Sequence, residues 1–161
     1  MAAEHAAFDA ALAAIIGQLG LTDSRPITPD PVRLDRTLST IATFMRSFHH
    51  PKEDDYLFKA VRERTRKLDD VLAALQHEHA RDAGAFQELR QALANTRPGA
   101  SSQLKDFAVL MESYARAQIE HMRVEKEMVL PVAERVLTSS DWAEIDVAFR
   151  ANRDPMYGTS R

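Results

Sequence analysis

Six side chains in this 161-residue sequence have the types and spacing of metal ligands. Each of four segments with helical periodicity carries one histidine on its apolar face. These histidines are His5, His49, His79 and His121. Two of them have a glutamate four residues later, Glu53 and Glu125. Positions i and i+4 lie about 40° apart around a helix and about 6 Å apart along it, so both members of a pair can reach one metal centre.

The four histidines and two glutamates together indicate a metal site more strongly than any one of them alone. A single histidine on an apolar face is usually a core residue, and one HxxxE motif is a weak signal in a charge-rich helical chain. Burying two glutamates in a helical core costs several kcal/mol each unless a cation compensates their charge. Four imidazoles and two carboxylates without a sulfur ligand suit iron or manganese, with zinc also possible. Two glutamates able to bridge predict two ions.

Four long helices and a short fifth helix are expected to position these residues. Apolar periodicity predicts helices over about 2–19, 31–64 and 65–95, and a fourth that starts near 101 and bends or ends at Pro131. Asp30 followed by Pro31 is a helix start signal, and Thr138 with Asp141 three residues later starts the fifth helix. Pro51 should kink or loosen the second helix because it cannot donate a backbone hydrogen bond.

This pattern predicts an all-α fold, an up-down-up-down four-helix bundle with a short C-terminal fifth helix. In an antiparallel bundle, the four histidines would lie at one level to within about 8 Å, judged from a rise of about 1.5 Å per residue. The chain length fits one domain, over residues 1–150, followed by a polar tail over 151–161.

Composition excludes several other classes of protein. The net charge is −3 and no basic stripe indicates nucleic-acid binding. No segment predicts a membrane span, and the apolar N-terminal stretch follows Glu4 and Asp9 without the basic residues of a signal peptide. The chain has no cysteine, which removes thiolate ligands and disulfides and fits a cytoplasmic protein.

Other polar residues near the motifs are expected to play lesser parts. His50 lies about 100° around the helix from His49, so a place beside the ligands or on the surface is predicted. His77 is expected on the surface, and Asp54 is expected to be solvated or paired with a basic residue. The residues expected in the core are Met45, Met128 and Tyr114, the last also a candidate neighbour of the metals, whereas the place of Tyr56 is left open.

The motifs resemble those of the hemerythrin-like HHE cation-binding domain family. The matching pieces are "AEHAAF", "HHPKEDDYLF", "LQHEHARD" and "HMRVEKEMVL", which together span most of the chain. The resemblance implies a non-haem di-iron centre bridged by the two glutamates and an oxo or hydroxo group. The ligands it implies are His5, His49, Glu53, His79, His121 and Glu125. Members of the family bind oxygen, sense iron or oxygen, or handle nitric oxide or peroxide.

One departure from the oxygen-carrying hemerythrins bears on function. Those proteins have HxxxH on the third helix, whereas the residue four positions after His79 is Ala83. Fewer protein ligands leave positions open to small molecules, which favours binding, sensing or reducing oxygen, peroxide or nitric oxide. The alternatives are an iron- or oxygen-sensing bundle that acts through a protein partner without turnover, and a metal-free interaction module. The sequence does not indicate an oligomeric state.

Overall fold

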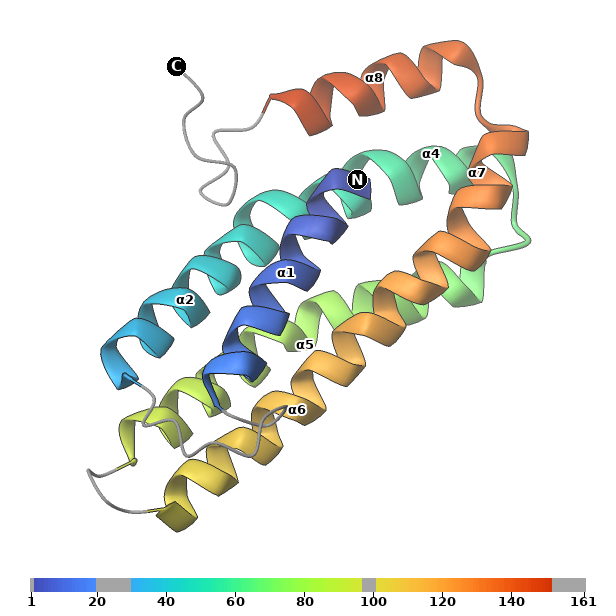
Figure 1. Ribbon diagram of the computed structural model, residues 1–161. Helices are drawn as coiled ribbons and strands as arrows, with labels where there is room; N and C mark the ends of the chain where they lie inside the picture. Colours follow the sequence, from blue (N-terminus) through green and yellow to red (C-terminus); the bar gives the residue numbers. More distant parts are fainter. Residues whose placement is uncertain (1, 20–29, 97–100, 152–161) are drawn as a thin grey trace.

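The computed structural model describes residues 2–19, 30–96 and 101–151, and all regular elements within these ranges are helical (Figure 1). The elements are α1 (Ala2–Gln18), α2 (Pro31–Phe44), η1 (Met45–His49), α3 (His50–Lys52), η2 (Glu53–Phe58), α4 (Lys59–Arg64), α5 (Asp69–Ala94), α6 (Ser101–Val124), η3 (Glu125–Val129), α7 (Leu130–Val136) and α8 (Ser139–Arg150). The three η segments are π-helical turns, so two of the long helices are composite.

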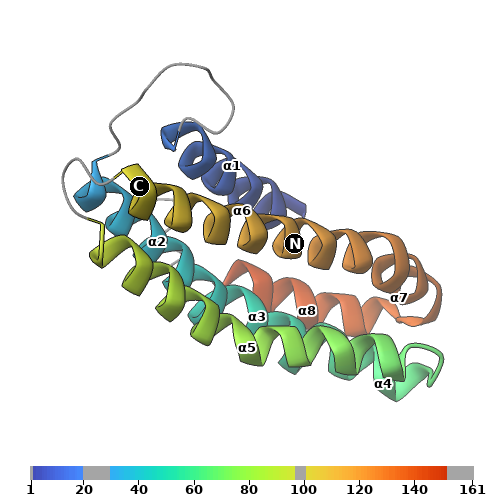
Figure 2. The same cartoon turned by 90° about the horizontal axis from the view of Figure 1, so that it is seen from below.

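Four helical rods surround a common core. One composite rod runs from α2 to α4 and the other from α6 to α7. The first helix contacts both α2 and α6, and α5 also contacts both, which closes the ring (Figure 2). The short α8 packs against α3 and η2. The predicted all-α bundle with a fifth helix is confirmed, whereas the up-down-up-down order stays a prediction.

Local signals start two helices where the sequence predicts them. The Asp30 carboxylate accepts hydrogen bonds from the backbone N–H groups of Val32 at 2.9 Å and Arg33 at 3.4 Å. Thr138 and Asp141 form a reciprocal capping box at the start of α8. The third long helix begins at Asp69 rather than near Thr65, because Thr65 is extended and its hydroxyl accepts a hydrogen bond from the Lys67 backbone N–H at 3.2 Å.

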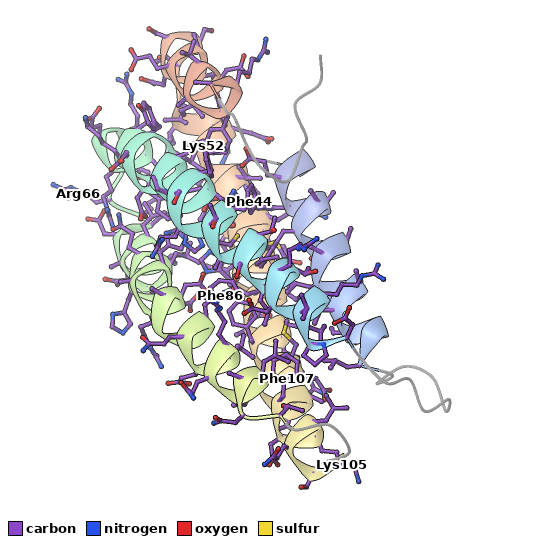
Figure 3. All side chains as sticks on the ribbon, turned by 90° about the vertical axis from the view of Figure 1, so that its left-hand side faces the viewer. Phe44, Lys52, Arg66, Phe86, Lys105 and Phe107 are labelled. Atoms are coloured by element: carbon purple, nitrogen blue, oxygen red, sulfur yellow. The ribbon has the colours of Figure 1, made fainter. Side chains whose placement is uncertain are left out.

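The apolar core consists of two clusters of buried residues. The larger cluster includes Phe44, Phe86 and Phe107, which Figure 3 shows inside the bundle. The smaller includes Leu57 and Leu72, and the aromatic side chains of α8 pack against it. Along the α2–α4 rod, α5 and the α6–α7 rod, the histidines and glutamates of interest fall between residues of one cluster and those of the other, and on α1 His5 precedes the residues of the larger cluster. A polar layer therefore separates two apolar ones.

Two further points concern membrane-spanning helices and the predicted C-terminal tail. No helix among the described residues has the length and apolarity needed to cross a bilayer. Of the predicted tail over 151–161, only Ala151 lies within the described residues, and the single-domain division at 150 stays a prediction.

Candidate metal centre

The six predicted ligands come together in the polar layer. His5 Nε2 lies 3.2 Å from Glu125 Oε2 and 3.6 Å from Glu53 Oε1. The two i, i+4 pairs are closed as predicted, with 3.2 Å between His49 Nε2 and Glu53 Oε1 and 3.3 Å between His121 Nε2 and Glu125 Oε1. The remaining histidine, on α5, places its Nε2 3.6 Å from the other oxygen of Glu53.

These side chains form two groups that share the glutamates. One group is His5, His49, Glu53 and Glu125, and the other is Glu53, His79, His121 and Glu125. In each group, one ligand atom from every residue lies within 4.8 Å of the other three. Because both carboxylates belong to both groups, the arrangement fits two adjacent cations bridged by glutamate.

Carboxylates outside the two groups fix the orientation of three imidazoles. Glu4 Oε2 lies 2.9 Å from His49 Nδ1, and Asp54 Oδ1 lies 3.1 Å from His79 Nδ1. Glu78 Oε2 lies 2.7 Å from the Nδ1 of His121. A carboxylate accepts the Nδ1–H proton, so each of these rings presents Nε2 to the centre, which is the usual arrangement around metal-bound histidine.

The glutamate oxygens at the centre are buried and lack conventional hydrogen-bond partners. Glu53 and Glu125 are fully buried, and within the described ranges none of their four oxygens has a hydrogen-bond partner. Burial opposes charge on His5, yet its neighbours Glu125 and Glu53 outweigh that effect and raise the pKa of His5 to about 9. Burial also opposes charge on His121, but neighbouring carboxylates, chiefly Glu125, outweigh it and raise the pKa of His121 to about 9. Unsatisfied buried oxygens facing imidazole nitrogens are suitable ligands for a cation.

A comparison with protein families gives one result. The model of the hemerythrin HHE cation-binding domain matches residues 1–133. The chain belongs to this family. Neither the curated proteins nor the solved structures give a match. The family is a cation-binding one, and the chain has His and Glu groups that could hold a metal ion. The two observations agree.

π-helical turns position candidate ligands in both composite rods of this hemerythrin HHE domain. His49 ends η1, Glu53 begins η2 and Glu125 begins η3. At the end of η1 the His50 backbone N–H donates to Met45 O, five residues earlier, which is the π pattern. The predicted loosening at Pro51 thus takes the form of π-helical turns on both sides of a short α-helical segment.

His50 is not on the surface, contrary to one of the two places predicted for it. Its side chain is buried, and its ring stacks on that of His79 with 3.9 Å between ring centroids and 10° between planes. Burial, followed by the charges of neighbouring imidazoles, lowers the pKa of His50 to about 2, so the ring is neutral. With His79 and His121 it makes a third group of possible metal ligands. The 100° rotation assumed from an α-helix does not hold where π-helical turns adjoin.

One other expectation needs correction, and two are confirmed. Met128 is 46% exposed instead of packed in the core. Asp54, expected to be solvated or paired with a basic residue, is partly exposed and lies against the imidazole of His79. His77 is exposed and Tyr114 is buried, as predicted. Tyr56, whose place the sequence left open, is 45% exposed.

Residues that sequence reasoning missed connect the centre to the first and last helices. Lys52 is buried and forms an ion pair with Glu4, and its ammonium lies 4.8 Å from the centre of the Phe149 ring. Because Glu4 also faces His49, α1 and α8 both contact the rod that carries His49. Glu4 immediately precedes a predicted ligand, but the sequence does not show that it faces a different histidine.

A groove between the α2–η2 rod and α5 reaches the centre from outside. It has a volume of about 950 Å³, and its lining includes His50 and His79 at its inner end and Thr43, Ala83 and Arg90 elsewhere. A groove of this size admits small molecules easily. Asp82 also lines it; burial raises the pKa of Asp82 to about 6, although Tyr114 and two ligand imidazoles oppose the rise.

Proposed function

We propose that this hemerythrin HHE domain binds two iron ions and that the centre binds, senses or reduces a small oxidant: oxygen, peroxide or nitric oxide. The proposed ligands are His5, His49, Glu53, His79, His121 and Glu125. The observation that carries the proposal is the sharing of Glu53 and Glu125 between two groups of four ligands. Carboxylates shared in this way hold two ions close together.

The donor set favours iron among the possible metals. Imidazole and carboxylate ligands without sulfur suit iron and manganese, and zinc is also accepted by such sites. Two bridged iron ions supply electrons to a bound oxidant, which zinc does not because it has no redox chemistry. The chain holds the ligands ready for this task, since carboxylates fix the Nε2 direction of His49, His79 and His121.

The number of ligands and the groove support handling of an oxidant rather than simple oxygen carriage. Each group offers two imidazoles and two shared carboxylates, fewer donors than the six positions of an octahedral ion. Open positions accept small molecules. The groove that ends at His50 and His79 offers such molecules a route from solvent.

Metal analysis and spectroscopy test this proposal. Protein loaded with ferrous iron without oxygen should contain two irons per chain, change its absorption spectrum with azide, and consume peroxide or nitric oxide. A long-lived and fully reversible oxygen adduct without any turnover would contradict the reductive function. Protein from iron-supplemented cells that holds no stoichiometric iron would contradict metal binding and favour a plain interaction module.

A sensor is the second candidate, and the links from the centre to α8 favour it. Lys52 joins Glu4, beside the ligand His49, to Phe149 of α8, whose Val147 is 70% exposed. Loss of metal at the centre would thereby alter the surface that α8 offers to a protein partner. A sensor should lose helicity when iron is removed and show little turnover, whereas an oxidant-reducing protein should consume peroxide or nitric oxide.

A further inference from the structure

The two proposed ions have unequal surroundings. His5 and His49 lie on one side of the bridging glutamates, and His79 and His121 lie on the other. On the second side a further imidazole joins the ligand atoms, because His50 forms a group with His79 and His121 whose ligand atoms lie within 4.8 Å of one another. His79 Nε2 and His121 Nε2 are 3.0 Å apart. Two nitrogens bound at right angles to one ion, each at about 2.1 Å, stand about 3 Å apart.

The Nε2 atom of His50 lacks a polar partner among the described residues of the metal-free chain. It is buried, and the described part of the protein offers it no hydrogen-bond partner. Leaving a buried polar atom unsatisfied costs about 1–3 kcal/mol. A histidine kept only for packing would be replaced by an apolar side chain of similar size without this cost. An unpaired nitrogen beside two candidate ligands therefore points to a cation.

The backbone allows His50 to face the same ion as His79. Adjacent residues of a π-helical turn are separated by less rotation than the 100° of an α-helix, which lets His49 and His50 both point inward. The rings of His50 and His79 are stacked and nearly parallel in the metal-free chain. Because an imidazole binds an ion in the plane of its own ring, one of the two rings must turn about its side-chain bonds when both bind the same ion. Ala83, one turn beyond His79, lines the groove and presents no competing ligand.

We propose that His50 Nε2 is a seventh protein ligand, the third imidazole of the ion held by His79 and His121. This inference rests on the proposed dinuclear centre. It gives the two ions different numbers of open positions: the ion beside His5 and His49 would keep one more than the ion beside His79 and His121, to which the groove leads. The centre would then have a fifth histidine ligand. It comes from the second helical rod, and not from the third as in the oxygen-carrying hemerythrins.

The test compares His50→Ala with His77→Ala, which removes an exposed histidine. Full-length protein is titrated with ferrous iron without oxygen, and the imidazole nitrogens per iron are counted by X-ray absorption and pulsed electron paramagnetic resonance. His50→Ala should keep the first ion and bind the second at least about 10-fold more weakly. Its count of imidazoles for two irons should fall from five to four, while His77→Ala should match the wild type.

Two controls separate this inference from the proposed function and from a structural role. A metal-free His50→Ala protein should melt close to the wild type, and adding Ala83→His to it should restore the fifth imidazole from α5. Unchanged iron affinity and imidazole count in His50→Ala would overturn the role of His50 and leave the dinuclear centre intact. Failure of the wild type to bind two irons would overturn the proposed function itself.

Discussion

At the scale of single residues, carboxylates decide which nitrogen of each imidazole faces the centre. Glu4, Asp54 and Glu78 each lie beside an Nδ1 atom, so the Nε2 atoms of three histidines point inward. This arrangement prepares the site before any ion arrives, and it makes those imidazoles more basic ligands. Only the ligands themselves, however, supply donor atoms to the centre.

The first prediction concerns the shared ligand pair on the fourth rod. His121→Ala or Glu125→Ala should abolish binding of two irons, because His121 belongs to one of the two groups that share the glutamates and Glu125 belongs to both. His77→Ala is the matched control, since that histidine is exposed on the same protein. Iron content per chain, measured after desalting, checks the prediction. Equal iron content in all three variants would show that the site lies elsewhere.

The second prediction concerns protons released by metal. In the metal-free protein the pKa values of His5 and His121 are about 9, so both imidazoles are charged at pH 7 and must lose a proton to bind an ion. Binding should therefore release about two protons per chain at pH 7. Apparent affinity should rise up to about a hundredfold per pH unit until the pH passes about 9.

Calorimetry in buffers of different ionisation enthalpy measures this release. The same raised pKa values imply that the pairing of His5 and His121 with glutamate stabilises the metal-free protein fully below pH 6.5, and that this stabilisation is lost as pH rises through about 9. Pairs this deeply buried are little screened by salt. An affinity independent of pH between 6 and 8 would contradict the assignment of these two imidazoles.

At the scale of elements, the composite rod from α2 to α4 carries three of the candidate ligands, more than any other rod. It holds His49, His50 and Glu53 within five residues, and Lys52 between them pairs with Glu4 of α1. Both Lys52 and Glu4 are buried. A buried ion pair between two helices fixes how they meet, because removing one partner leaves the other charge without compensation.

The third prediction tests this ion pair. Lys52→Met should destabilise the metal-free protein by about 3 kcal/mol, since a buried carboxylate loses its cation. The double variant with Glu4→Gln should be destabilised by about 1–3 kcal/mol less than the sum of the single changes. Urea unfolding of the four proteins gives this coupling energy. The exposed pair of Glu112 and Arg116 is the control, with an expected coupling below about 1 kcal/mol.

A fully additive pair of changes at positions 4 and 52 would show that the contact does not join the helices. A change at Glu4 should also affect metal binding, because Glu4 contacts the candidate ligand His49 as well as Lys52. We therefore expect Glu4→Gln to weaken iron binding by about 10-fold to 100-fold, as for other partners of metal-bound histidine.

The sequence predicts the elements better than it predicts the neighbours of the ligands. His5, His49, His79 and His121 continue apolar stripes, so their convergence follows from helical periodicity and from the bundle. The inward position of His50 could not follow, because Pro51 predicts a loosened helix but not its π-helical form, and α-helical geometry turns His50 away from the centre. Contacts between rods, such as that of Glu78 with His121, depend on tertiary packing.

At the scale of the whole molecule, the centre lies between two apolar clusters. Along three of the four rods, residues of the larger cluster lie on one side of the candidate ligands and those of the smaller cluster lie on the other, whereas α1 contributes only to the larger cluster. Without metal, the layer between them contains fully buried carboxylates whose oxygens have no hydrogen bond within the described residues.

The fourth prediction follows from this arrangement. The unfolded chain cannot hold the six ligands together, so iron at about 1,000 times its dissociation constant should stabilise the native protein by about 4 kcal/mol. For a chain of this size each kcal/mol shifts the Tm by about 2–4 °C, which gives a rise of about 8–16 °C. Calorimetry under nitrogen, with and without ferrous iron, measures the shift. His121→Ala should show almost none, and an equal rise in that variant would mean that iron stabilises the protein outside this centre.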